Sequence, residues 1–414
     1  MPTKISRCRI CGNQRLKPVL DLGEQALTGV FPRSKETSIT SGPLRLVKCE
    51  VGNDACGLLQ LEHSYDLSEM YGLNYGYRSG LNSSMVRHLY AKVGRIRDHV
   101  QLARGDLVID IGSNDGTTLG AYGDHGFRLV GVDPTGVKFQ SFYPPFVELI
   151  ADFFSAQLLR QQLGGQKAKV VTSFSMFYDL EDPLAFMRDV YEALADDGIW
   201  VFEQSYMPRM LETNSFDTVC HEHLEYYALR QICWMTDRVG FRIVDVDFND
   251  VNGGSFSVSV RKARAGEDKA LIPAVERILA AEAAAGLDTL EPYLAFAERV
   301  AHARRDLLAF LGEARAAGKT VAALGASTKG NVVLQYCGID EGLVATVGEV
   351  NPEKFAGFTP GTLLPIVPEE DLLATQPDYL LVLPWHFRDF FCNSAMFKGR
   401  TLVFPLPRLE IVEC

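Results

Sequence analysis

The stretches LVIDIGSNDGTTL (residues 107–119) and RLVGVDP (128–134) decide the fold of the middle of this chain. Each begins with a short apolar run typical of a strand buried on both faces, and the first run leads into a glycine-containing turn. Similar runs follow at helix-length intervals, at VELIADF (147–153), KVVTSFSMF (169–177) and GIWVFEQSY (198–206). This alternation predicts a parallel sheet with helices on both faces.

The turn after the first of these strands has the character of an adenosyl-binding loop. Gly112 and Gly116 let the backbone approach a ligand, and Asp133 ends the next strand, where it could bind ribose hydroxyls. A dinucleotide loop requires G-x-G-x-x-G, whereas the spacing from Asp110 to Gly116 supplies a carboxylate suited to a cation and favours S-adenosylmethionine. A turn without a ligand is the alternative. The candidate cofactor-binding residues are Asp110, Gly112, Asn114, Gly116, Asp133, Asp152, Phe153 and Ser173.

Composition excludes several classes of protein. The chain has 414 residues, with 41 Lys and Arg against 52 Asp and Glu, a formal charge of −11. This acidic balance argues against a nucleic-acid-binding protein or one that binds an anionic membrane. No apolar run is long enough to span a bilayer, and the N-terminus does not resemble a secretory signal. We expect a cytoplasmic protein, a monomer or a small homo-oligomer.

Four of the nine cysteines lie in the first 56 residues: Cys8, Cys11, Cys49 and Cys56. Two thiolate pairs on separate turns can complete a tetrahedral zinc site and staple a segment too small to bury a core. Such a closed site is structural, because no coordination position remains open for chemistry. Four unrelated thiols, or a redox Cys-x-x-Cys, are the alternatives.

The fold class predicted is α/β, with a small zinc-binding module, a central Rossmann-like domain and a second Rossmann-like domain. We place the module at residues 1–67 and the central domain at 68–265. A helical connector follows at 266–318, and the last domain spans 319–414. The Gly- and Tyr-rich stretch 70–84 is interpreted as a lid or substrate loop.

The segment LGASTKGN (324–331) opens the last predicted domain with another strand-to-helix turn. Backbone amides, hydroxyls and one ammonium at a helix N-terminus are typical of a pyrophosphate site. It is not a Walker loop, because glycine follows the lysine. A simple helix cap is the alternative. The candidate substrate-binding residues are Ser327, Thr328, Lys329, Asn331 and Glu349.

The segment VCHEHLEYY (219–227) gathers imidazoles, carboxylates and phenols. Histidine titrates near neutral pH and can act as a base that a neighbouring carboxylate orients. The alternatives are a His-x-His zinc site and a histidine that packs in the core. For His221, a place in the core is as well supported as a role in catalysis. Tyr226 and Tyr227 are more typical of packing aromatics.

Together these motifs resemble the S-adenosylmethionine-dependent C-methyltransferases that act on nucleotide-linked deoxysugars. The resemblance implies a zinc-binding N-terminal domain, a central class I methyltransferase domain and a C-terminal domain that helps to hold the sugar nucleotide. It rests on CRICG (8–12), YGYRSG (75–80), VIDIGSNDG (108–116), SFSMFYDLEDP (173–183), residues 202–229, NGGS (252–255) and GASTKGNVVL (325–334).

The resemblance also implies a reaction. A base removes the C3 proton of a 4-keto-6-deoxysugar, and the resulting enolate attacks the methyl group of S-adenosylmethionine. It selects His223 as the base with Glu222 beside it, and we assign His221 to support. Tyr75 and Tyr77 are candidates to bind the enolate oxygen or close over the sugar. The rival functions are O- or N-methylation of a sugar nucleotide and a non-catalytic zinc- and nucleotide-binding module.

Overall fold

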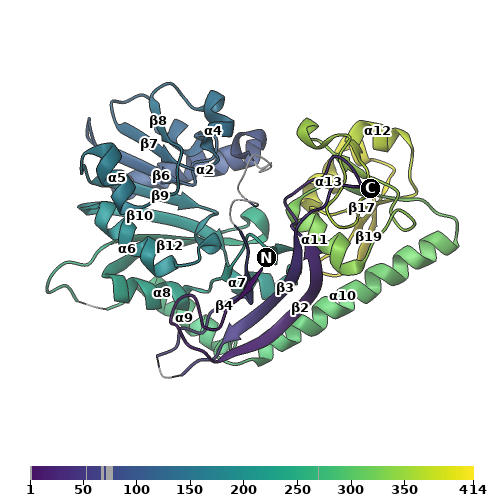
Figure 1. Ribbon diagram of the computed structural model, residues 1–414, viewed down its shortest axis with the longest axis horizontal. Coiled ribbons are helices and arrows are strands. Elements are labelled where there is room, and N and C mark those ends of the chain that lie inside the picture. Colours follow the sequence, from purple (N-terminus) through teal and green to yellow (C-terminus); the bar gives the residue numbers. More distant parts are fainter. Residues whose placement is uncertain (1, 53, 67–69, 71–77, 269) are drawn as a thin grey trace.

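The predicted alternation builds a seven-stranded sheet in the middle of the chain (Figure 1). The computed structural model describes residues 2–52, 54–66, 70, 78–268 and 270–414. The strands, in their spatial order, are β12 (Phe241–Asn249), β13 (Ser255–Lys262), β10 (Leu194–Ser205), β9 (Ala168–Phe174), β6 (Leu107–Ile111), β7 (Arg128–Val132) and β8 (Val147–Ile150). The five from β10 to β8 are parallel, and β13 is antiparallel to both its neighbours.

Helices cover both faces of this sheet, and each face buries its own apolar cluster. Val93 and Ile96 of α2 pack on one face, and residues of α5, α6 and α8 pack on the other. Side-chain caps begin two of the helices: Asn82 accepts from the Ser84 amide before α2, and Asp182 caps α6. The helices are α2 (Ser83–His99), α3 (Thr117–Gly120), α4 (Gly136–Phe139), α5 (Ala156–Leu163), α6 (Pro183–Ala193), α7 (Met207–Glu212) and α8 (Leu229–Val239).

The N-terminal segment forms a four-stranded antiparallel sheet of β2 (Leu16–Ala26), β3 (Ser41–Cys49), β4 (Leu59–Leu61) and β11 (Glu225–Tyr226). β1 (Thr3–Lys4) pairs with β5 (His63–Ser64). β3 and β4 coincide with the apolar stretches LRLVKCE (44–50) and CGLLQLEH (56–63), which are typical of strands. No comparable pattern indicates the long strand β2. The fourth strand, β11, belongs to the segment VCHEHLEYY (219–227), so this segment is part of the N-terminal sheet.

The last part of the chain forms a six-stranded sheet after two connecting helices, α9 (Pro273–Ala284) and α10 (Glu291–Ala316). Its strands are parallel except for the last one, β19. In spatial order they are β16 (Ile366–Pro368), β15 (Val347–Glu349), β14 (Val321–Leu324), β17 (Tyr379–Val382), β18 (Thr401–Phe404) and β19 (Glu410–Glu413). Its helices are α11 (Thr328–Cys337), α12 (Glu369–Ala374) and α13 (Arg388–Asn393).

The β2–β3 hairpin lies between the two α/β units, with α10 alongside (Figure 1). One apolar cluster joins this hairpin, α10 and the C-terminal sheet, whereas the four N-terminal cysteines belong to a core cluster of the central sheet. The N-terminal segment is therefore packed against both units. None of the described helices combines the length and the apolar composition that a bilayer crossing requires.

Candidate functional site

The four N-terminal cysteines converge on one point. Their sulfur atoms all lie within 4.8 Å of one another, with 3.5 Å from Cys8 to Cys56 and 3.6 Å from Cys11 to Cys49. A tetrahedral zinc with Zn–S bonds of about 2.3 Å requires sulfurs about 3.8 Å apart, so the four residues fit the ion.

Arg9, inside the first cysteine pair, connects this cluster to the central domain. Its guanidinium donates to the Leu61 carbonyl at 2.7 Å and to Ser64 Oγ at 2.9 Å. Its Nε donates to Glu181 Oε2 at 3.2 Å, and Glu181 lines a cavity at the carboxyl end of β6. The cysteine cluster therefore holds a residue that contacts the wall of that cavity.

The cavity, of 230 Å³, lies at the carboxyl ends of β6, β7 and β9. Asp110, Gly112, Asn114, Asp133 and Phe153, all predicted from the sequence, line it. Burial raises the pKa of Asp110 to about 7, although the Thr172 hydroxyl donates to its carboxylate at 2.5 Å. A cationic ligand nearby would favour the ionised carboxylate, which suits a sulfonium cosubstrate.

The backbone of the glycine-containing turn approaches the cavity closely. Gly112 has a φ of 73°, and a Cβ atom there would lie 3.1 Å from Met176 Cγ. Asp133 accepts from the amides of Asn114 at 2.8 Å and Thr135 at 2.7 Å, which fixes its carboxylate at the cavity wall. Carboxylate oxygens have further lone pairs with which to accept from ribose hydroxyls.

The end of the predicted substrate loop docks on the same turn. The amide of Ser79 donates to Asn114 Oδ1 at 2.9 Å, and that of Gly80 donates to Asp115 Oδ2 at 2.8 Å. The loop therefore ends at the mouth of the cosubstrate cavity. Tyr75 and Tyr77, predicted to act on the sugar, lie outside the described residues.

Three predicted cofactor residues lie elsewhere. Ser173 is fully buried and accepts from the Trp200 indole at 3.0 Å, so it packs in the core of the sheet. Asp152 is exposed, and its carboxylate accepts from the amide of Phe153 at 2.7 Å. Gly116 caps α3 with a φ of 75°, and a Cβ atom there would meet the Tyr143 ring. Gly116 therefore shapes the turn.

His223 has the geometry of a neutral base. Its Nδ1 lies 2.9 Å from the Thr218 carbonyl oxygen, which can only accept, so Nδ1 carries the proton and Nε2 the lone pair. Burial, together with the charge of Lys329, lowers its pKa to about 4, although the hydrogen bond to Thr218 acts to raise it. The ring of Tyr178 lies 4.3 Å from it, centroid to centroid. A carbonyl thus orients His223, where the sequence suggested the Glu222 carboxylate.

Glu222 faces the N-terminal segment. The Thr28 hydroxyl donates to its Oε2 at 3.3 Å, and a Cβ atom on Gly29 would lie 2.7 Å from its Oε1. Burial raises the pKa of Glu222. A side chain at position 29 would therefore force the Glu222 carboxylate to move.

His221 lies in the core. Its ring is fully buried edge-on to Tyr65, with centroids 4.6 Å apart, and burial lowers its pKa to about 4. Among the described residues neither ring nitrogen has a hydrogen-bond partner. The core alternative left open by the sequence therefore matches its position.

The C-terminal loop meets the His223 segment. Lys329 Nζ donates to the Asn252 carbonyl at 2.7 Å, and its charge acts on both His223 and Asp217. Thr328 lies near Gly29 and Glu222: a Cβ atom built on Gly29 would be 3.7 Å from Thr328 Oγ1 and 2.7 Å from Glu222 Oε1.

The other predicted substrate residues fix this loop and its neighbour. Ser327 caps α11 by accepting from the backbone amide of Gly330 at 3.0 Å, and Asn331 donates from its side-chain Nδ2 to the Thr28 carbonyl at 2.8 Å. Glu349, at the end of β15, accepts from the amides of Val350 at 2.8 Å and Asn351 at 3.0 Å.

Sequence reasoning missed two residues that join the C-terminal domain to this centre. The Trp385 indole donates to Asp217 Oδ2 at 2.9 Å, with both side chains buried. Asp217 precedes Thr218, whose carbonyl holds His223. Asp217 lies inside the quoted motif 202–229, but a contact made across 168 residues leaves no local pattern.

Comparisons with known proteins cover the whole chain. Residues 8–71 match the model of a zinc binding domain, 85–246 a methyltransferase domain, and 250–407 a C-methyltransferase C-terminal domain. The chain is 30% identical to the C-methyltransferase NovU of Streptomyces niveus over 415 aligned residues, 99% of this chain and 97% of that protein.

Solved structures match part of the chain. The CcbJ methyltransferase of Streptomyces caelestis is 14% identical, with a TM-score of 0.32 over 43% of this chain and 90% of that one. An S-adenosylmethionine-dependent methyltransferase from Clostridium acetobutylicum is 12% identical, with a TM-score of 0.34 over 43% of this chain and 92% of that one.

Proposed function

The chain belongs to the S-adenosylmethionine-dependent C-methyltransferases, and from this premise we propose that it methylates C3 of a nucleotide-linked 4-keto-6-deoxysugar. The observation that carries the proposal is the juxtaposition of His223, a neutral base, with Lys329, a cation on the C-terminal loop. A sugar nucleotide needs both, since its carbon acid must meet a base while its diphosphate meets a cation.

His223 performs the proposed proton transfer. Its Nε2 takes the C3 proton while the Thr218 carbonyl steadies Nδ1–H, and the electron pair left on carbon delocalises to O4. When bound, the cosubstrate would supply an electrophilic methyl group on sulfur, and the electron pair of the broken sulfur–methyl bond would stay on the sulfur of S-adenosylhomocysteine. As the new carbon–carbon bond forms, O4 becomes a ketone again, and His223 later releases its proton to solvent.

The C-terminal loop would hold the diphosphate. Lys329 brings an ammonium group, and the N-terminal amides of α11 add partial positive charge. Glu349 ends the strand next to β14, a position suited to accepting hydrogen bonds from a ribose. This local site is compatible with the acidic whole-chain charge of −11.

Deuterium exchange tests the enolate step. Incubated in deuterated water without S-adenosylmethionine, the enzyme should exchange the hydrogen at C3 of a thymidine- or uridine-diphosphate 4-keto-6-deoxysugar. Mass spectrometry would detect the label. Methyl transfer without any such exchange would contradict C3 enolisation and favour O- or N-methylation.

Variants test the base. We expect His223→Ala to lower turnover by about 100- to 10,000-fold, and Glu222→Gln to lower it far less, because the Thr218 carbonyl orients His223 while Glu222 faces Thr28. Calorimetry with S-adenosylhomocysteine should show binding unchanged in both, because neither residue lines the cavity. His302→Ala, at an exposed histidine of α10, is the matched control. Full activity of His223→Ala would refute its role as the base.

A further inference from the structure

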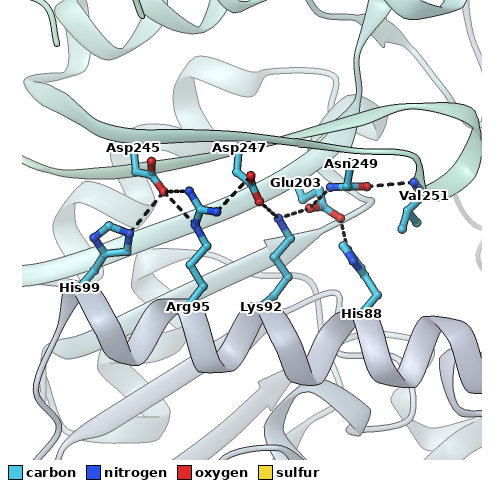
Figure 2. Close-up of polar contacts among 9 residues, drawn as sticks. All are labelled: His88, Lys92, Arg95, His99, Glu203, Asp245, Asp247, Asn249 and Val251. Carbon is cyan, nitrogen blue, oxygen red and sulfur yellow. Dashed lines mark hydrogen bonds and ion pairs between the residues drawn. The ribbon is translucent and has the colours of Figure 1, made fainter. Parts of the chain in front are cut away.

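A polar network outside the proposed reaction centre joins α2 to β10 and β12 (Figure 2). On α2 the four members recur three or four residues apart and so share one helix face, and on β12 they alternate and so share one sheet face. The helix contributes His88, Lys92, Arg95 and His99, and the strands contribute Glu203, Asp245, Asp247 and Asn249.

Glu203 is the buried end of this network, with its side chain 4% exposed. It accepts from His88 Nε2 at 2.5 Å, Lys92 Nζ at 2.7 Å and Asn249 Nδ2 at 2.8 Å. Burial works to raise the pKa of Glu203, but the His88 hydrogen bond and the Lys92 charge lower it on balance. The carboxylate is therefore ionised and held by three donors.

One arm of the network reaches the cosubstrate cavity. His88 lies on α2 between Met85 and Leu89, and both of these line the cavity. The backbone carbonyl of Glu203 accepts from the amide of Ser175 at 2.8 Å, and Ser175 also lines the cavity. Glu203 is therefore bonded to two segments that line the cavity, although it does not line the cavity itself.

The other arm reaches Lys329. Asn249 donates to Glu203 with its amide nitrogen, and its Oδ1 accepts from the Val251 amide at 3.0 Å. The next residue, Asn252, has a φ of 56°, and its carbonyl accepts from Lys329 at 2.7 Å. Asn249 thus holds the turn that positions the Lys329 ammonium group.

We propose that Glu203 is a positioning residue that couples the cosubstrate cavity to the turn at Val251–Gly253, and through it to Lys329. A fully hydrogen-bonded buried carboxylate is rigid, because any displacement leaves a charge unpaired. A cosubstrate that fixes α2 therefore also fixes the turn. The meaning of this coupling for the sugar nucleotide rests on the proposed function, whereas the coupling itself does not.

Hydrogen–deuterium exchange and calorimetry with S-adenosylhomocysteine test the coupling on the full-length protein. In the wild type, the ligand should slow amide exchange in peptides covering residues 249–254, although none of these lines the cavity. Glu203→Gln replaces one acceptor oxygen by a donor. We expect it to weaken binding about tenfold and to abolish the slowing at saturating ligand.

Two variants of the same network sharpen the test. Asn249→Ala leaves His88 and Lys92 bound to Glu203, so it should bind S-adenosylhomocysteine as the wild type does, yet it should lose the slowing because it cuts the arm to Lys329. Asp245→Asn, at the outer end where Asp245 meets Arg95, should keep both properties. It controls for loss of charge on the same strand.

Retained slowing in Glu203→Gln or in Asn249→Ala would overturn the coupling. So would an equal loss in Asp245→Asn, since the network would then be merely structural. If Glu203→Gln does not fold, the comparison of exchange rates between Asn249→Ala and Asp245→Asn still decides whether the coupling exists. The test uses no sugar, so a failure of the C3-methylation proposal would appear only in the exchange at C3.

Discussion

Two histidines of one short segment have different environments. His221 and His223 both have a pKa of about 4, mainly because of burial. His223 has a carbonyl on one nitrogen and a cation nearby, whereas His221 packs against Tyr65. The sequence shows two equivalent imidazoles. The difference arises from Thr218, Lys329 and Tyr65, which are brought there by the fold.

The buried His221 should make the protein sensitive to acid. Its pKa falls from 6.5 in the unfolded chain to about 4 in the fold, so the unfolded state binds the proton more tightly. The stability that the neutral ring contributes is present above pH 6.5 and is lost as the pH falls towards 4, by about 3 kcal/mol in total. Denaturant unfolding from pH 7 to 4.5 should show a shallower loss in His221→Leu than in the wild type. Parallel losses in the two proteins would contradict the assignment.

At the scale of elements, the turn between β6 and α3 depends on Gly112 for space as well as for conformation. A Cβ atom there would press on Met176 at the cavity wall, and φ is positive. Gly164, after α5, has a φ of 64° with no atom within 4 Å of such a Cβ. The two glycines therefore share the conformational demand but differ in the space around them.

Alanine at these two glycines separates the effects. Each variant should lose about 1–2 kcal/mol of stability from the left-handed conformation. Gly112→Ala should also weaken S-adenosylhomocysteine binding about tenfold, because Met176 is displaced into the cavity. Gly164→Ala should bind normally by calorimetry. Equal affinities in the two variants would show that Gly112 is needed for conformation alone.

Elements with a local signal were predictable, and elements formed by distant pairing were not. The apolar runs of the central sheet predict strands β6 to β10, and the serine before α11 indicates a helix cap. β11 has two residues and exists because Glu225 and Tyr226 pair with β4, more than 160 positions earlier. β2 mixes exposed and buried positions irregularly around its bulges, which hides the alternation of a strand.

At the scale of the whole molecule, the cysteine cluster connects units that the sequence presents as separate. Its cysteines belong to the core of the central domain, and Arg9 reaches from it to Glu181 at the cosubstrate cavity. The hairpin that follows shares a core with the C-terminal sheet. The boundaries at residues 67, 265 and 318 stay predictions, and packing crosses the first of them extensively.

Loss of the metal should therefore affect cosubstrate binding as well as stability. We expect about one zinc per chain by elemental analysis, and none in Cys56→Ser. Without zinc the four thiols lose their common centre, Arg9 loses its anchor, and the melting temperature should fall by about 10 °C or more. The affinity for S-adenosylhomocysteine should fall too, since Glu181 lines the cosubstrate cavity.

Cys337→Ala, at a buried cysteine of α11, is the control. It should cost about 1–2 kcal/mol of stability by leaving a small void in the core, yet keep the zinc and the affinity. A zinc-free Cys56→Ser protein with wild-type affinity would show that the cluster only stabilises the fold.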